Sequence, residues 1–214
     1  MRSITPYTLL ILLIGCSTEN HQAQFNSLLN SEWERMIADN PVYASSMGDL
    51  TNNTNWSDTS IEKINSNHQI ELQVLSQLEE FETKNFSEEN QVNYLLFKKQ
   101  YENSIEALYF KKFLMPFSHR GGIQLEHETT SMIPLRNKQN FLDWIERLSK
   151  INTLIDDAIE KARIGIDQGI VPPRFLMEKV YKQIALQVFI EPKDSPFYRV
   201  FQNIDNEIDS SREI

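Results

Sequence analysis

The sequence predicts an all-α fold, a multi-helix array with one long central helix. Residues 141–173 hold its longest run of apolar residues spaced by three, four or seven positions, as on one side of a helix. The 214 residues include only six glycines and eight prolines, so a sheet would lack its turns. Alternating apolar and polar residues, which indicate strands, are hard to find.

Composition limits the function classes. With 40% hydrophobic and 24% charged residues, 214 residues are enough for one sizeable core. The 21 basic residues are scattered among 30 acidic ones, giving a net charge of −9. Because nucleic-acid binding needs clustered Lys and Arg, we expect no nucleic-acid partner, and no electrostatic attachment to anionic lipid.

The first sixteen residues have the order of an export signal: Arg2, an apolar run over 9–14, then Gly15 and Cys16. The run is too short to span a bilayer. Residues 13–16, LIGC, resemble the bacterial lipobox, in which the cysteine becomes the first mature residue and is acylated. Several acyl chains give durable anchoring. We therefore predict a signal peptide over 1–15 and lipidation of Cys16; the alternative is an ordinary signal peptide with an incidental cysteine.

Ser17, rather than Asp, follows the cysteine, as in lipoproteins released to the outer membrane. The predicted location is the bacterial cell envelope, with the protein anchored in the outer membrane through Cys16 and facing the periplasm. Residues 16–24 are polar and are predicted to form a tether. One helical domain follows over 25–214. We expect this domain to be incomplete, because its last amphipathic helix reaches Ile214 without a cap.

The first helix is predicted from Phe25 to the Asn40-Pro41 pair, since proline disfavours helix at the residue before it. Gly48 should cap a short helical turn after that pair. The polar residues 49–58 are a loop by composition.

A second helix is predicted over 60–82. Ser87 should cap a third helix, whose first turn carries two acidic residues that favour the positive end of the helix dipole. This third helix, over 88–113, is apolar on more than one side. We expect it to be the most buried helix.

Residues 117–136 are the least regular segment. The central helix begins after them, at Phe141, and Gly169 is predicted to be its left-handed cap. Pro172 prevents the helix from continuing, and Pro173 opens another helix, since proline is tolerated in a first turn.

The irregular segment holds the candidate functional residues, because loops between rigid helices often carry function. Arg120, Gly121 and Gly122 could offer a guanidinium and two backbone donors to a substrate carboxylate, or form a plain turn. His127 begins an incomplete H-E-x-x-H zinc motif, in which Ser131 replaces the second histidine. We therefore predict no catalytic or metal-binding residue in the chain, and a substrate-facing loop around these four candidates.

Several short motifs, in this order and spacing, resemble the amino-terminal part of the bacterial family called domain of unknown function 885. They are Trp33 with the Asn40-Pro41 pair and then MGD at 47–49, WSD at 56–58, GIQ at 122–124, FLDWIERL at 141–148, and G-x-x-x-GIVPP at 165–173.

The resemblance implies a helical fold similar to zinc metallopeptidases of the H-E-x-x-H type. Members are typically longer lipoproteins, so zinc is expected only in a full-length relative. The chain would be the helical scaffold of such a peptidase, inactive alone, with a peptide as partner. It is either a fragment or a stand-alone lipoprotein. The alternative functions are a non-catalytic envelope binding module and a structural lipoprotein.

Overall fold

The computed structural model describes residues 18–188 and 191–202. The predicted signal peptide over 1–15, the lipidation site Cys16 and the end of the last predicted helix lie outside these ranges. Within them the chain forms helices, turns and loops, with a single isolated bridge between Ser118 and Gly121 in place of strands. The all-α prediction is confirmed.

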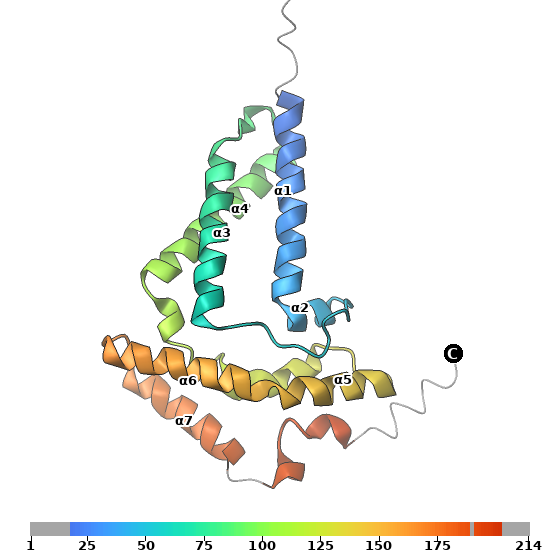
Figure 1. The fold of residues 1–214 in the computed structure, drawn as a ribbon, viewed down its shortest axis with the longest axis vertical. Coiled ribbons are helices and arrows are strands. Elements are labelled where there is room, and N and C mark those ends of the chain that lie inside the picture. Colours follow the sequence, from blue (N-terminus) through green and yellow to red (C-terminus); the bar gives the residue numbers. More distant parts are fainter. Residues whose placement is uncertain (1–17, 189–190, 203–214) are drawn as a thin grey trace, which may run out of the picture.

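In the part of the chain that the structure describes, seven α-helices are joined by loops and short 3₁₀ turns. Three of them, α1, α3 and α4, stand side by side, and the other long helices form a base across their lower ends (Figure 1). No helix in the described ranges is both long and apolar enough to cross a membrane. The helices are α1 (Thr18–Asp39), α2 (Pro41–Ser46), α3 (Ile61–Glu79), α4 (Glu88–Tyr109), α5 (Lys138–Ser149), α6 (Ile151–Asp167) and α7 (Arg174–Val188).

The ends of the helices follow local sequence. The Ser60 and Ser87 hydroxyls each accept a hydrogen bond from the backbone N–H three residues on, at 3.2 Å, which confirms the cap predicted at Ser87. Gly48 has a φ of 93°, in agreement with its predicted place after α2. Two starts were wrong: α1 begins at Thr18 rather than Phe25, so most of the predicted tether is helical, and the central helix begins at Lys138 rather than Phe141.

The long central helix is broken, which corrects the prediction of one continuous element. Lys150, with φ −101° and ψ 1°, separates α5 from α6, although the two still run end to end across the base (Figure 1). The Lys150 Nζ donates to the Thr54 carbonyl at 3.1 Å and to Asn55 Oδ1 at 2.9 Å, so the 49–58 loop is held at the break. Neither Gly nor Pro marks this point, and apolar spacing alone cannot reveal it.

Two separate hydrophobic clusters stabilise the upright part and the base. The upper cluster surrounds Phe25, which is fully buried among aromatic rings of α4 and of the turn between α3 and α4, together with aliphatic side chains of α3. The lower cluster contains Trp56 and Trp144, whose ring centroids lie 5.9 Å apart in an edge-to-face arrangement. Trp56 also donates from Nε1 to the Arg147 carbonyl at 2.7 Å, which joins the 49–58 loop to α5.

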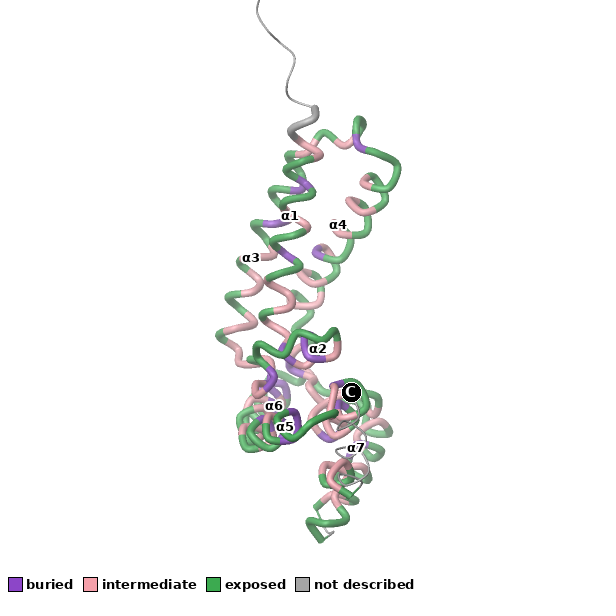
Figure 2. The backbone as a smooth tube through the Cα atoms, turned by 90° about the vertical axis from the view of Figure 1, so that its right-hand side faces the viewer, coloured by how far each residue is buried: buried purple, intermediate pink, exposed green. Residues whose placement is uncertain are grey.

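The third helix is not the most buried, contrary to the prediction. Tyr101 is the one buried residue of α4, and Figure 2 shows this helix as exposed or intermediate along nearly all its length. Leu95 and Leu96 are 65% and 67% exposed. The apolar residues on its outer side have no neighbouring helix in the described part of the chain.

The end of α6 explains the two glycines of the G-x-x-x-GIVPP motif. Gly169 has a φ of 70°, and its N–H bonds to the Ile166 carbonyl, while the Ile170 N–H bonds to the Gly165 carbonyl at 2.7 Å. This pair of bonds is the Schellman arrangement that ends helices, so the predicted cap is confirmed. Gly165 is needed because there is no room for a side chain. A Cβ at this position would lie 2.6 Å from the Leu114 carbonyl oxygen and 2.8 Å from that of Ile170.

We expect Gly165→Ala to destabilise the protein by about 1–3 kcal/mol, because backbone rather than a flexible side chain must move. Thermal unfolding followed by circular dichroism would measure the loss. Gly121→Ala is the control, since nothing lies within 4 Å of a Cβ at Gly121 and its φ is not left-handed. Equal losses in the two variants would contradict the close-approach explanation.

Candidate functional site

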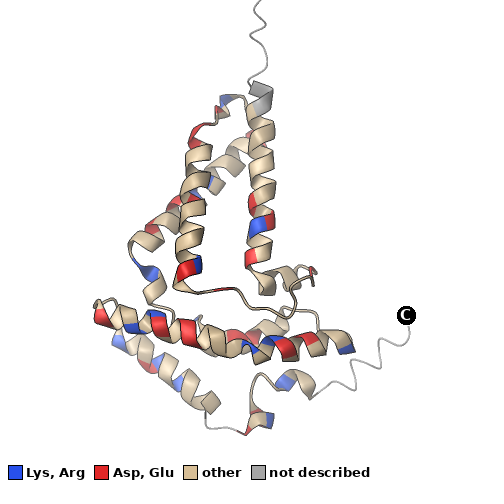
Figure 3. Ribbon diagram, in the orientation of Figure 1, with Lys and Arg blue, Asp and Glu red and all other residues tan. Residues whose placement is uncertain are grey.

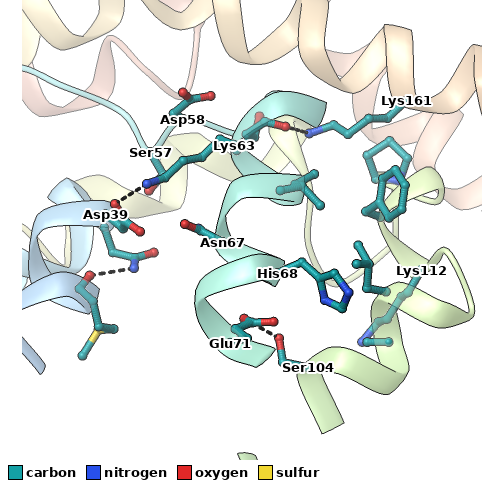
Figure 4. Close-up of a pocket in the computed structure, with 18 of the residues that line it drawn as sticks. Asp39, Ser57, Asp58, Lys63, Asn67, His68, Glu71, Ser104, Lys112 and Lys161 are labelled. Atoms are coloured by element: carbon teal, nitrogen blue, oxygen red, sulfur yellow. Dashed lines mark hydrogen bonds and ion pairs between the residues drawn. The ribbon is translucent and has the colours of Figure 1, made fainter. Parts of the chain in front are cut away.

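A polar cavity of about 710 Å³ opens where α1, α3 and α4 meet the base (Figure 4). Its walls come from these three helices, the 57–59 loop, residues 112–116 and α6. The polar side chains that line it include Arg35, Asp39, Asp58, Lys63, Asn67, His68, Glu71, Ser104, Lys112 and Lys161.

The α1 wall is fixed by a network of charged groups. Arg35 donates to Glu32 from Nη2 at 2.6 Å and from Nε at 2.8 Å, and the Tyr101 hydroxyl also donates to Glu32. Burial and the hydrogen bond to Glu32 raise the pKa of Tyr101, which stays a neutral phenol. Asp39 then accepts from Lys63 of α3 at 2.7 Å, so the network joins α1 to both neighbouring helices.

The α3 wall presents three more polar side chains besides Lys63. Asn67 points toward Asp39, whereas His68 points toward Lys112 on the other side of the cavity (Figure 4). Glu71, one turn further along α3, accepts a hydrogen bond from the Ser104 hydroxyl at 2.7 Å. The cavity therefore offers an imidazole and a carboxylate as well as amide and amine groups.

Lys161 is the most unusual residue of the site, since only 6% of it is exposed. Its Nζ donates to the Thr59 carbonyl at 2.5 Å, which is the one hydrogen bond it makes to the described residues. Burial lowers the pKa of this amine, while Asp157 and Asp58 act in the opposite direction. A buried ammonium with donors to spare favours a ligand with an acceptor group.

The cavity contains both signs of charge. Figure 3 shows acidic and basic residues interspersed along α6 and at the lower end of α3, and of these Lys63 and Lys161 line the cavity. Such a mixed lining suits a ligand that carries donors, acceptors and charges of both signs. No group of three or more His, Cys, Asp or Glu side chains in residues 18–188 and 191–202 could share a metal ion.

The four residues of the predicted substrate-facing loop lie elsewhere and do not line the cavity. Arg120 is exposed and belongs to the tight turn closed by Ser118 and Gly121. Gly122 has a φ of 118°, and a Cβ there would lie 2.9 Å from the Pro116 carbonyl, so glycine is needed for the backbone path. The His127 ring lies against Phe197, with centroids 5.7 Å apart.

Gln124, in the same segment, holds it against α7. Its side chain donates to the Ser118 carbonyl at 2.8 Å and to Gln183 Oε1 at 3.2 Å, and Gln187 donates to the Gln124 carbonyl at 2.6 Å. The segment around the four candidates is thus packed on the base, as a 3₁₀ turn over Ile123–Ser131.

Sequence reasoning missed the cavity residues, although a weak indication exists. Arg35 and Asp39 stand one helical turn apart, and Asn67 and Glu71 do the same on α3. Such spacing is common on solvated helix faces, so it does not single out a site. Lys161 comes from a helix about 100 residues away in sequence, and only the fold brings it to the others.

One comparison with known proteins gives a match. The family model described as a bacterial protein of unknown function, DUF885, matches residues 41–213. No curated protein and no solved structure is similar enough to match. The matched region covers most of the chain, including the cavity walls from α3 to α6. The chain therefore belongs to the DUF885 family.

Proposed function

We propose that this chain is the helical scaffold of a zinc peptidase-like bacterial lipoprotein, and that its polar cavity holds a peptide without cleaving it. Membership of the DUF885 family and the motif resemblance support this reading. The observation that carries it is the cavity itself, with buried and half-buried groups of both charge signs on the three helices α1, α3 and α6.

A short peptide suits the cavity in size and in chemistry. About 710 Å³ lies within the 300–1,000 Å³ typical of small-molecule sites. A peptide has an amide donor and an acceptor at each residue, and charges of opposite sign at its ends. Asp39 and Asn67 lie on one side and Lys112 and His68 on the other, so each end has groups that could bind it.

The chemistry of peptide cleavage is assigned to zinc in a full-length relative, since the sequence lacks the H-E-x-x-H spacing. The purified full chain, kept in detergent, should bind a mixture of fluorescent tetrapeptides in a polarisation assay. Mass spectrometry should find no new peptide ends after incubation with zinc. Zinc-dependent cleavage by this chain, or no binding of any peptide, would contradict the proposal.

The cavity variant for this assay is Lys161→Met, which keeps the length of the side chain and removes the ammonium. We expect it to weaken peptide binding by about tenfold or more, the effect of losing a hydrogen bond from a charged donor. Lys182→Met on the exposed side of α7 is the matched control and should bind as the wild type does. Equal affinities of the two variants would place the peptide outside the cavity.

A second candidate is a lipid-anchored binding module that acts alone. One observation supports it: the residues that line the cavity all come from this chain. Sequencing past the codon for Ile214 separates the two. An in-frame continuation that encodes H-E-x-x-H supports the scaffold. A stop codon, together with stable expression of the short form, supports the module.

Anchoring through Cys16 is part of the proposal and has its own test. The wild-type chain should sediment with the outer membrane of a bacterial host, whereas Cys16→Ser should be recovered in soluble fractions. Several acyl chains account for this difference, since one chain alone binds membranes only marginally. A Cys16→Ser protein that still sediments with membranes would count against the lipid.

A further inference from the structure

A second, apolar pocket of about 320 Å³ lies next to the polar cavity. All ten of its lining residues are apolar, and they come from residues 114–117, the end of α6, the 170–172 turn and the start of α7. Leu114 forms part of it and is itself only 2% exposed. A charged or strongly polar group would lose its hydration here without gaining a partner.

The two hollows share a wall. Met115 and Pro116 line both of them, and the consecutive residues Lys161 and Ala162 of α6 line the cavity and the pocket respectively. The cavity and the pocket therefore lie on either side of the 115–116 segment. A ligand that crosses this segment would meet charged and polar side chains in the cavity and only apolar side chains in the pocket.

The walls of the pocket are held in place by backbone contacts. The close approach of Gly165 to the Leu114 carbonyl fixes α6 against residues 112–114, and the Schellman bonds at Gly169 fix the turn that follows. At the rim, Ile166 is 65% and Val171 is 53% exposed. Exposed apolar residues around a preformed apolar hollow are typical of a binding site.

We propose that this pocket binds an apolar side chain of the peptide whose polar groups occupy the adjoining cavity. The inference rests on the proposed function and adds to it a preference for peptides with apolar side chains. Peptides with aliphatic or aromatic side chains bind more tightly than polar peptides of equal length, because only they fill the pocket. The rim residues then lose water-exposed apolar area on binding.

The methionines of the chain allow each hollow to be observed separately. Met36 lines the polar cavity and not the apolar pocket, while Met177 lines the pocket and not the cavity. Met47 and Met132 lie in neither and are 61% and 55% exposed, so they report non-specific surface binding. The experiment uses the full chain labelled with [¹³C-methyl]methionine, with signals assigned by single Met→Leu variants.

The two probes are trileucine and triserine. Trileucine is expected to shift the signals of both Met36 and Met177, and triserine that of Met36 alone. If trileucine shifts Met36 but leaves Met177 unchanged, the apolar site is overturned and the proposed function stands. If neither signal moves with either probe, both fail. Shifts at Met177 alone, or equal shifts at Met47 and Met132, also overturn the joint placement.

A substitution provides an independent measurement. Ala162→Leu would narrow the pocket and should remove the preference for trileucine, which we expect to be about tenfold or more. Its affinity for triserine should stay unchanged, which also shows that the variant folds. Ala38→Leu, at an exposed position of α1, is the matched control. An undiminished preference in Ala162→Leu would contradict the proposal.

Discussion

Replacing Phe25 with alanine is expected to lower the free energy of unfolding by about 3–5 kcal/mol, the range for removing a large buried aromatic ring. Phe25 is 0% exposed, and its ring lies within 6.4 Å, between centroids, of four other rings, three of them edge-to-face. The void could not be filled easily, because these partners are held on α4 and in the turn between α3 and α4. Since domains are typically stable by about 5–15 kcal/mol, much of the protein would unfold.

Urea unfolding followed by circular dichroism would measure this loss. Leu95→Ala is the control, because it removes an apolar side chain from α4 that is 65% exposed. We expect its effect to stay within about 0.5 kcal/mol. A large loss in Leu95→Ala would mean that the outer side of α4 is covered in solution.

The contrast between these two residues shows where the sequence could and could not predict burial. Both lie on apolar stripes at helical spacing, and the helix of Leu95 even has the more apolar composition of the two. Spacing shows which residues share a side of a helix, but not whether another element covers that side. Coverage depends on how helices distant in sequence pack together.

Local features, by contrast, were predictable because they involve residues that lie close together in the chain. The cap at Ser87, the turn at Gly48 and the stop at Gly169 depend on neighbouring residues in the chain, and the structure has all three. The break at Lys150 coincides with contacts to the 49–58 loop, about 95 residues away, and was not predictable.

The candidate site was harder still to predict, since α1, α3, α4 and α6 each contribute only one or a few of its polar groups. Most of these groups resemble ordinary solvated residues within their own helix. The loop around Arg120 and His127 looked functional because it is irregular. Its irregularity follows from the close path at Gly122 and the packing of Gln124 on α7.

Arg147 is the clearest case of a charged residue that the sequence would place in solvent. It is 0% exposed; its Nη2 donates to Ser45 Oγ at 2.9 Å, and its guanidinium carbon lies 5.7 Å from the Trp56 ring centroid. The Nε and Nη1 groups have no hydrogen-bond partner among the described residues. Burial lowers the pKa of Arg147 to about 10, with Asp143 acting in the opposite direction.

The direction of this shift determines how Arg147 affects stability. Because the folded pKa lies below the ordinary value of 12.5, folding disfavours the protonated form. Holding the charge of Arg147 in the folded state therefore costs stability at neutral pH, and this penalty would fall only as the pH rises above about 10. Removing the charge while keeping the volume should relieve the penalty.

Arg147→Met is therefore expected to leave the free energy of unfolding at pH 7 unchanged or to raise it by up to about 4 kcal/mol. Arg147→Ala should unfold with a free energy about 2–5 kcal/mol below that of the methionine variant, because it leaves a void beside the Trp56 ring. Urea unfolding of both variants beside the wild type would measure these differences. A methionine variant less stable than the wild type would show that the contacts of the guanidinium outweigh its burial.

The comparison isolates the guanidinium, because the hydrogen bond that Trp56 donates goes to the backbone carbonyl of residue 147 and not to its side chain. Either substitution leaves that carbonyl in place, so the 49–58 loop should remain attached to α5. The loop leads directly to residues 57–59 in the wall of the polar cavity. If Arg147→Met is more stable than the wild type and binds peptide equally well, the positive charge of Arg147 serves neither the fold nor the site. The side chain then contributes only its volume to the lower cluster.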